Sequence, residues 1–179
     1  MVDAGKGKLG MKVTLTKAQL SQCTQAGNLR NQLARLSGIK NQKIDKDRPE
    51  TDIDVLGAKA ELAVSLVFGV DFSLNAMGID DGCDFFLHDI GVDVKSTFYK
   101  TGRMLFRSKD TFKADVCILA TATDRPNQVE VVGWLSRKEF MQIAQMSDVG
   151  QYSGWAVDQD KLRPLGELWH IYKQRELSG

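Results

Sequence analysis

The sequence predicts a single α/β domain built on a mixed β-sheet. A chain of 179 residues has the usual length of one domain and can bury roughly two thirds of its unfolded surface. A hydrophobic content of 42% and a charged content of 26% are typical of globular proteins, which argues against a disordered chain. Segments with helical periodicity come before a run of short apolar segments, so we expect helices to flank a sheet of four to five strands.

The first helix is indicated by a capping pattern. Residues 1–10 are rich in Gly and Lys, and Thr16 followed by Gln19 forms the pair in which each side chain satisfies the other's free backbone amide. An approximate apolar stripe continues to about Ser37, and Gly38 is a natural stop. We therefore expect a helix from Thr16 to about Ser37.

A second helix is expected from about Asp54 to Phe68. It has a wide apolar face, and Gly69 follows it as a C-terminal cap. The polar residues 39–52 before it are expected to form a connection, and residues 70–83 after it are expected to form a loop.

Several strands should follow. Residues 84–88 and 91–98 are separated by a short turn, which predicts a hairpin. In the simpler interpretation of the basic residues that follow, they lie on the solvated outer face of a twisted hairpin that turns at Gly102. The continuous apolar run 114–122 indicates a central, fully buried strand, and residues 129–134 indicate the strand after it.

The last part of the chain should complete the fold. Ser136 and Glu139 repeat the capping pattern, so a helix is expected from there to about Met146. A short strand is expected at 152–157. The final segment is expected to be an amphipathic helix whose apolar residues are Leu165, Leu168, Trp169 and Tyr172.

Composition also narrows the functional classes. Three cysteines, at 23, 83 and 117, are too few and too far apart for a disulfide framework, which favours a reducing, cytoplasmic setting. With two histidines, a structural zinc site is not expected. No apolar stretch approaches the ~20 residues that a membrane-spanning helix needs, so no membrane partner is expected.

An acidic cluster lies between basic segments. Residues 79–93 contain five Asp and no Lys or Arg, whereas residues 95–113 contain six Lys or Arg and one Asp. This distribution is what a metal site within a phosphate-binding surface would have. A solvated surface with uneven charge is the simpler interpretation.

Asp93 and Lys95 are the strongest candidates for chemistry. Residues two apart in a strand point to the same face, so these two side chains should lie together while Val94 points into the core. The hairpin would bring Asp84 alongside them. Two carboxylates and the main-chain carbonyl of Val94 suit a small hard cation, and we expect Mg²⁺, with Mn²⁺ as a substitute.

Lys95 would hold or activate a water that attacks a phosphate, and it would stabilise charge on that phosphate. Burial beside a metal could lower the pKa of Lys95 enough to help. Glu61 lies among small apolar residues on the second helix, an unusual place for a carboxylate. It would complete the metal site or extend it to a second ion. The simpler alternatives are a surface ion pair for Asp93 and Lys95, and a solvated helix position for Glu61.

These four residues occur in the order and on the elements found in the PD-(D/E)XK nuclease superfamily, which the chain resembles over about residues 54–134. The resemblance includes four local segments similar to small phage and bacterial members: Gly57–Glu61, Asp81–Asp84, Val94–Thr97 and Gly133–Trp134. The family's proline before the first Asp is replaced by Cys83, which makes the assignment of Asp84 weaker than that of Asp93 and Lys95.

The resemblance implies a restriction-endonuclease-like core and hydrolysis of DNA phosphodiester bonds by Glu61, Asp84, Asp93 and Lys95. It implies one nuclease domain over 1–179, with an N-terminal helical extension (1–50), a catalytic core (54–134) and a C-terminal completion (135–179). DNA is the expected partner, a homodimer is possible, and no organic cofactor is expected. The setting would be the cytoplasm of a bacterium or of a phage-infected cell.

Polar and basic residues after Lys95 are candidate DNA contacts, because cations follow the phosphates of a nucleic acid. They are Ser96, Thr97, Lys100, Arg103, Arg107, Lys109 and Lys113. Two other classes remain open: a non-catalytic nucleic-acid-binding protein with a nuclease-like fold, and a structural or partner-binding protein with an accidental motif. The first should lack one of the acids or the lysine, yet all four are present.

Overall fold

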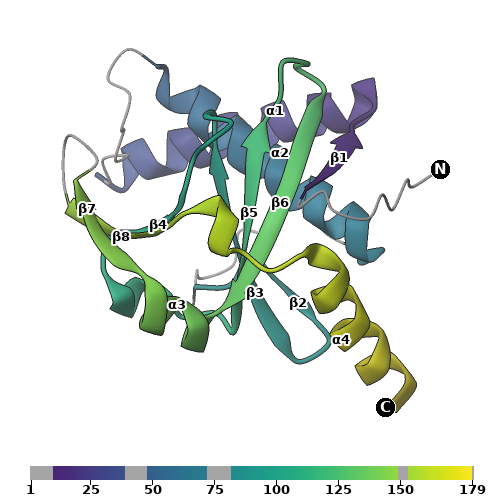
Figure 1. The fold of residues 1–179 in the computed structure, drawn as a ribbon. Helices are drawn as coiled ribbons and strands as arrows, with labels where there is room; N and C mark the ends of the chain where they lie inside the picture. Colours follow the sequence, from purple (N-terminus) through teal and green to yellow (C-terminus); the bar gives the residue numbers. More distant parts are fainter. Residues whose placement is uncertain (1–9, 39–47, 72–81, 149–152, 179) are drawn as a thin grey trace.

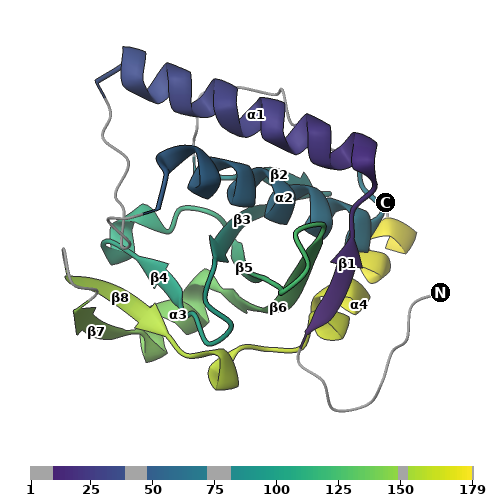
Figure 2. The same ribbon diagram turned by 90° about the horizontal axis from the view of Figure 1, so that it is seen from above.

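The computed structural model describes residues 10–38, 48–71, 82–148 and 153–178, and it shows an α/β fold. Seen from above, helix α1 (Lys17–Leu36) lies over helix α2 (Glu50–Phe68), and α2 lies over the larger of two sheets (Figure 2). The smaller sheet lies on the side away from α1 and α2 in that view, and Figure 1 shows helix α3 (Arg137–Ile143) beside it. The expected loop at 70–83 and connection at 39–52 lie largely outside the described residues.

The larger sheet has five strands in the order β1-β6-β5-β3-β2. Strands β3 and β5 are parallel and the other neighbours are antiparallel, which confirms the predicted mixed sheet. The strands are β1 (Met11–Thr14), β2 (Phe85–Leu87), β3 (Ile90–Thr97), β5 (Val116–Ala122) and β6 (Gln128–Ser136).

The smaller sheet is antiparallel, with the order β4-β8-β7. Its strands are β4 (Met104–Phe106), β7 (Gln145–Asp148) and β8 (Ser153–Val157). The helices are α1 (Lys17–Leu36), α2 (Glu50–Phe68), α3 (Arg137–Ile143) and α4 (Leu165–Ser178), with 3-10 turns η1 (Lys109–Thr111) and η2 (Gln159–Lys161). Both predicted capping boxes, at Thr16 and at Ser136, are present.

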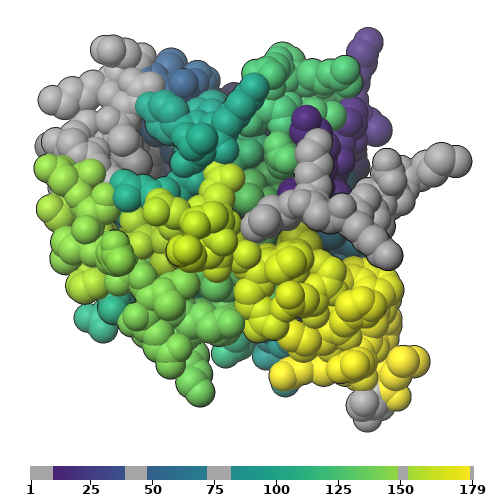
Figure 3. Space-filling model, in the orientation of Figure 1, coloured from purple at the N-terminus to yellow at the C-terminus, as the bar shows by residue number. Residues whose placement is uncertain are grey.

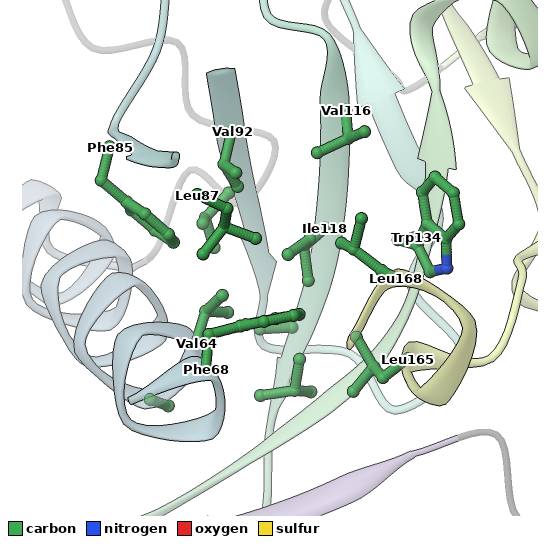
Figure 4. Close-up of a cluster of buried hydrophobic side chains, with 14 of the residues drawn as sticks. Val64, Phe68, Phe85, Leu87, Val92, Val116, Ile118, Trp134, Leu165 and Leu168 are labelled. Carbon is green, nitrogen blue, oxygen red and sulfur yellow. The ribbon is translucent and has the colours of Figure 1, made fainter. Parts of the chain in front are cut away.

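Each face of the larger sheet buries its own apolar core. On one face, Val64 and Phe68 of α2 and Leu168 of α4 pack against strand residues such as Val92 and Ile118 (Figure 4). The C-terminal segment, yellow in Figure 3, covers the lower right part of the surface seen in that view. On the other face, residues of β4, α3 and the turn after η1 pack against the alternate residues of β5 and β6.

Several sequence predictions need correction. Helix α2 begins at Glu50 rather than near Asp54, after Pro49, which supplies no side-chain cap. The hairpin of β2 and β3 turns at His88 and Asp89, where His88 has a φ of 55°. The alternative of a hairpin around Gly102 is not what the structure shows, because β4 pairs with β8 and not with β3.

The helix predicted to reach Met146 ends at Ile143, and Met146 lies in strand β7, where it pairs with Trp155. Strand β1 was not expected from the sequence at all, and it forms the edge of the larger sheet beside β6. Within the residues described, no helix is long and apolar enough to cross a membrane.

Candidate active site

Strand β3 positions Asp93 and Lys95 on the face of the larger sheet that the smaller sheet covers. In the parallel register Asp93 lies opposite Cys117, and Cys117 belongs to the core on that face. Asp93 is 6% exposed. The Lys95 Nζ donates to Asp93 Oδ1 at 2.7 Å and lies 4.8 Å from the centre of the Phe106 ring. The strand therefore brings these two side chains together as the two-residue repeat predicts.

Asp84 is brought against the same strand from the opposite side of the hairpin. Its backbone N–H donates to the carbonyl of Val92 at 2.7 Å, one step beyond the last paired residue of β2. Its side-chain Oδ2 then accepts a hydrogen bond from the N–H of Val94 at 2.6 Å. The Asp84 carboxylate therefore accepts the backbone hydrogen bond that a further residue of β2 would otherwise accept from β3. This places the carboxylate beside the backbone of Asp93.

The Asp84 carboxyl has a pKa raised to about 7. Burial of the carboxyl group is the largest cause, and the negative charges of Glu61 and Asp93 add to it, while the hydrogen bond from Val94 opposes it. The residue as a whole is exposed, so it meets solvent as well as its charged neighbours. The charges of Glu61 and Asp93 therefore both act on the Asp84 carboxyl.

Glu61 is buried on α2, so it does not occupy a solvated helix position. Arg30 of α1 holds it with a two-pronged ion pair, in which Nη1 donates to Oε1 at 2.7 Å and Nη2 to Oε2 at 2.6 Å. This pair raises the pKa of Arg30 further above its ordinary value. The sequence analysis missed Arg30, although it lies on the same helical face as the buried Cys23 and Gly27.

The lowering of the Lys95 pKa is a prediction for the side chain beside a bound metal, and the neighbouring side chains alone act in the opposite direction. Burial is the largest single cause and disfavours the ammonium, but the charge and hydrogen bond of Asp93, together with other negative groups such as Asp84, raise the pKa of Lys95 above its ordinary value. The side chain, which is 37% exposed, therefore carries a full positive charge at neutral pH. With these neighbours Lys95 donates a hydrogen bond to Asp93.

Asp84 and Asp93 fit a divalent cation. Carboxylate, main-chain carbonyl and water oxygens are the ligands that Mg²⁺ takes in proteins. Burial raises the pKa of Asp84 most, and the negative charges of Glu61 and Asp93, which a bound cation would offset, raise it further. Among the described residues no group of three or more His, Cys, Asp or Glu side chains is arranged to hold a metal ion. The carbonyl of Val94 and waters would have to complete a two-carboxylate set.

The predicted DNA contacts divide into groups. Ser96 and Thr97 are half-buried at the end of β3, and Arg107 is exposed. Lys100 pairs with Asp124 at 2.8 Å. Arg103 donates to Ser147 at 2.6 Å and lies 3.8 Å from Asp158. Acidic neighbours thus partly offset the charges of Lys100 and Arg103.

Lys109 and Lys113 lie elsewhere, beside a pocket of about 410 Å³ between η1 and α3. Arg137 and Lys138, which the sequence analysis did not single out, line the same pocket, and its one acidic residue is Asp110. Lys109 is held by the carbonyl of Met141 at 2.7 Å. We call the four cations Lys109, Lys113, Arg137 and Lys138 the α3 basic cluster.

The cluster adjoins the candidate active site through Gly82. The side chain of Lys113 packs so closely on Gly82 that a Cβ there would lie 2.7 Å from the Lys113 Cβ. Gly82 also has a φ of 92°, which favours glycine, and it precedes Asp84 by two residues. The basic cluster and the acidic residues therefore lie on adjoining segments.

The comparisons with known proteins leave the family open: no protein-family model, no curated protein and no solved structure matches this chain. The residues around Asp84, Asp93 and Lys95 and their geometry are therefore the basis for assigning a function.

Proposed function

We propose that this protein is a magnesium-dependent deoxyribonuclease of the PD-(D/E)XK kind. The observation that supports it best is the convergence of Asp84, Asp93 and Lys95 on one stretch of β3. The Asp84 carboxylate is hydrogen-bonded to the Val94 N–H at 2.6 Å, and the Lys95 ammonium to Asp93 at 2.7 Å. Asp93 is buried beside the Lys95 ammonium, and a buried carboxylate with further charges around it is costly, so such a group is more often kept for chemistry than for stability.

The proposed roles follow from the chemistry of each group. Asp84, Asp93 and the carbonyl of Val94 hold the metal, with Mn²⁺ as a substitute for Mg²⁺. When bound, the ion supplies Lewis-acid stabilisation of a phosphoryl oxygen. Lys95, which stays protonated, donates to a phosphate oxygen or to the attacking water and offsets charge that develops during hydrolysis.

The α3 basic cluster and the polar end of β3 would bind the phosphates on either side of the cut. Cations around a pocket attract the nucleic-acid backbone without reading its sequence. This assignment keeps the predicted contacts at Ser96, Thr97, Lys100, Arg103 and Arg107, and it adds Arg137 and Lys138.

The test is a cleavage assay on supercoiled, linear, single-stranded and branched DNA, with Mg²⁺, Mn²⁺ or EDTA. The wild type is compared with Lys95→Ala and with Lys161→Ala, a control in which an exposed lysine paired with Asp160 is removed. We expect metal-dependent cutting by the wild type and the control. Lys95→Ala should lose at least ~10²-fold in rate, because a charged donor to the developing negative charge is gone.

Cutting by Lys95→Ala at the wild-type rate would remove this lysine from the mechanism. If the wild type binds DNA and cuts none of the substrates, the better interpretation is a non-catalytic nucleic-acid-binding protein. If it neither binds nor cuts, the nucleic-acid proposal is wrong.

A further inference from the structure

The ion pair of Arg30 and Glu61 joins α1 to α2 next to the candidate metal site. Both Glu61 carboxylate oxygens accept a guanidinium N–H, at 2.7 and 2.6 Å. The Glu61 side chain is 9% exposed and the Arg30 side chain 29%. Such a planar, two-pronged pair fixes the orientation of both groups.

This geometry does not suit Glu61 as a metal ligand. A divalent cation at either carboxylate oxygen would have to displace a guanidinium N–H and would lie beside a positive charge. Arginine keeps its proton under all ordinary conditions, and Glu61 raises the Arg30 pKa further. Glu61 is therefore already neutralised, whereas the crowded Asp84 carboxyl has no such partner at hydrogen-bond distance among the described side chains.

Arg30 has donors to spare. A guanidinium carries five N–H groups, and the pair with Glu61 uses one on each Nη. Among the described residues its hydrogen bonds go to Glu61 alone. The negative charge of Asp84 also helps to raise the pKa of Arg30, so Arg30 lies within electrostatic range of the candidate metal site. A partly exposed guanidinium with free donors, held rigidly beside an acidic cluster, is well suited to a phosphate oxygen.

We propose that Arg30 and Glu61 form a phosphate-binding site beside the metal site, in which Glu61 positions Arg30 and Arg30 binds a phosphate group of the DNA strand. Glu61 then acts through Arg30 and not as a metal ligand. The inference rests on the proposed function, since it takes DNA as the substrate. It also gives α1, outside the region of family resemblance, a part in substrate binding.

The first measurement is metal binding without DNA, by calorimetric titration with Mg²⁺ and with Mn²⁺. The variants are Glu61→Gln, Arg30→Lys, the neutral pair Arg30→Gln/Glu61→Gln and, as the reference for a lost ligand, Asp93→Asn. We expect Asp93→Asn to lose at least ~10-fold in metal affinity. The other three should stay within about twofold of the wild type.

The second measurement is the affinity for a short DNA duplex in EDTA, where no metal-dependent cutting occurs, at several salt concentrations. The neutral pair should bind ~10-fold more weakly at low salt, with the slope of log affinity against log salt reduced by about one. Arg30→Lys keeps the positive charge but loses the planar guanidinium, which can donate two parallel hydrogen bonds. It should keep most of the salt slope and bind with intermediate affinity.

Arg30→Lys and the neutral pair are chosen so that a loss of DNA affinity does not come from misfolding. Arg30→Lys leaves a cation beside the buried Glu61, and the neutral pair leaves two amides that can bond to each other, so neither strands a buried charge. Thermal melts check that both variants fold.

The outcomes separate the two proposals. If Glu61→Gln loses as much metal affinity as Asp93→Asn, Glu61 is a metal ligand and the inference is overturned. The inference is also overturned if the wild type binds DNA and the neutral pair has the same DNA affinity and salt slope as the wild type. If the wild type does not bind DNA at all, both the inference and the proposed function are wrong.

Discussion

At the scale of single residues, Gly27 sets how closely α1 and α2 approach. A Cβ added at Gly27 would lie 2.6 Å from the backbone nitrogen of Val55 and 2.7 Å from its Cα. Backbone atoms cannot rotate away, so the two helices would have to separate. Arg30, one turn further along α1, depends on the same approach to reach Glu61.

We expect Gly27→Ala to destabilise the protein by about 1–3 kcal/mol, because overpacking outweighs the roughly 1 kcal/mol that alanine gains in a helix. Gly57→Ala in α2 is the matched control, since no atom lies within 4 Å of a Cβ placed there. It should leave stability unchanged or raise it by up to about 1 kcal/mol. Urea unfolding measures both, and equal effects of the two substitutions would contradict the tight crossing.

The buried thiol of Cys23 predicts a pH effect on stability. Burial raises the pKa of Cys23 from its usual value near 9 to about 11. As pH rises past 9 the unfolded chain loses this proton first, so the free energy of unfolding falls until the folded thiol also ionises near pH 11. The expected loss is about 1–3 kcal/mol.

The measurement is urea unfolding of the wild type, Cys23→Ala and Cys83→Ala between pH 7 and pH 11. Cys23→Ala should be less stable than the wild type at pH 7 because it leaves a cavity. This difference should shrink toward pH 11, since the variant has no thiol to ionise. Cys83→Ala, at a half-buried position, controls for the removal of a thiol as such. If the difference in free energy of unfolding between the wild type and Cys23→Ala stays constant from pH 7 to pH 11, burial does not raise the pKa of Cys23.

At the scale of secondary structure, the short helix α3 depends on its cap. The Ser136 hydroxyl accepts from the Glu139 N–H at 3.2 Å, and the Ser136 N–H donates to Glu139 Oε2 at 3.0 Å. We expect Ser136→Ala to cost about 1 kcal/mol, because it leaves a backbone donor of the first turn without its acceptor. Ser136→Thr, which keeps a hydroxyl, should lose much less. Thermal melts compare the two, and equal losses would show that the cap hydroxyl contributes nothing.

Capping boxes, buried strands and the β2–β3 hairpin were predictable because their signals are local. Thr16 and Gln19 lie three residues apart, and the apolar run of β5 is continuous in the sequence. The start of α2 was misplaced because Pro49 offers no polar side chain as a cap. Strands β1 and β4 have four and three residues, and their partners lie far along the chain, so no local pattern marks them.

The same distinction applies to the candidate site. Asp93 and Lys95 share a strand face by the two-residue repeat, and Asp84 follows from the hairpin. Arg30 and Glu61 lie on different helices, and only the crossing of α1 over α2 brings them together. The raised pKa of Lys95 likewise depends on the strength of its pairing with Asp93, which the sequence alone does not give.

At the scale of the whole molecule, a net charge of +1 conceals where the positive charge lies. Lys161 and Lys173 form ion pairs with Asp160 and Glu176 on the C-terminal part of the chain. Lys113 and Lys138 are exposed beside the pocket between η1 and α3. If the overall charge governed DNA binding, the loss of any two lysines would weaken binding equally. If a local site binds the DNA, the loss of Lys113 and Lys138 should weaken binding more than the loss of Lys161 and Lys173.

The double variants Lys113→Gln/Lys138→Gln and Lys161→Gln/Lys173→Gln separate these possibilities, because each removes two positive charges. DNA affinity is measured in EDTA between about 50 and 200 mM salt. We expect the first variant to bind ~10-fold more weakly at low salt, with a salt slope smaller by about two, because two phosphate contacts are gone. The second should match the wild type within about twofold. Equal losses in both would mean that the attraction is general, and a loss in the second alone would place the DNA against α4 and η2 instead of the α3 basic cluster.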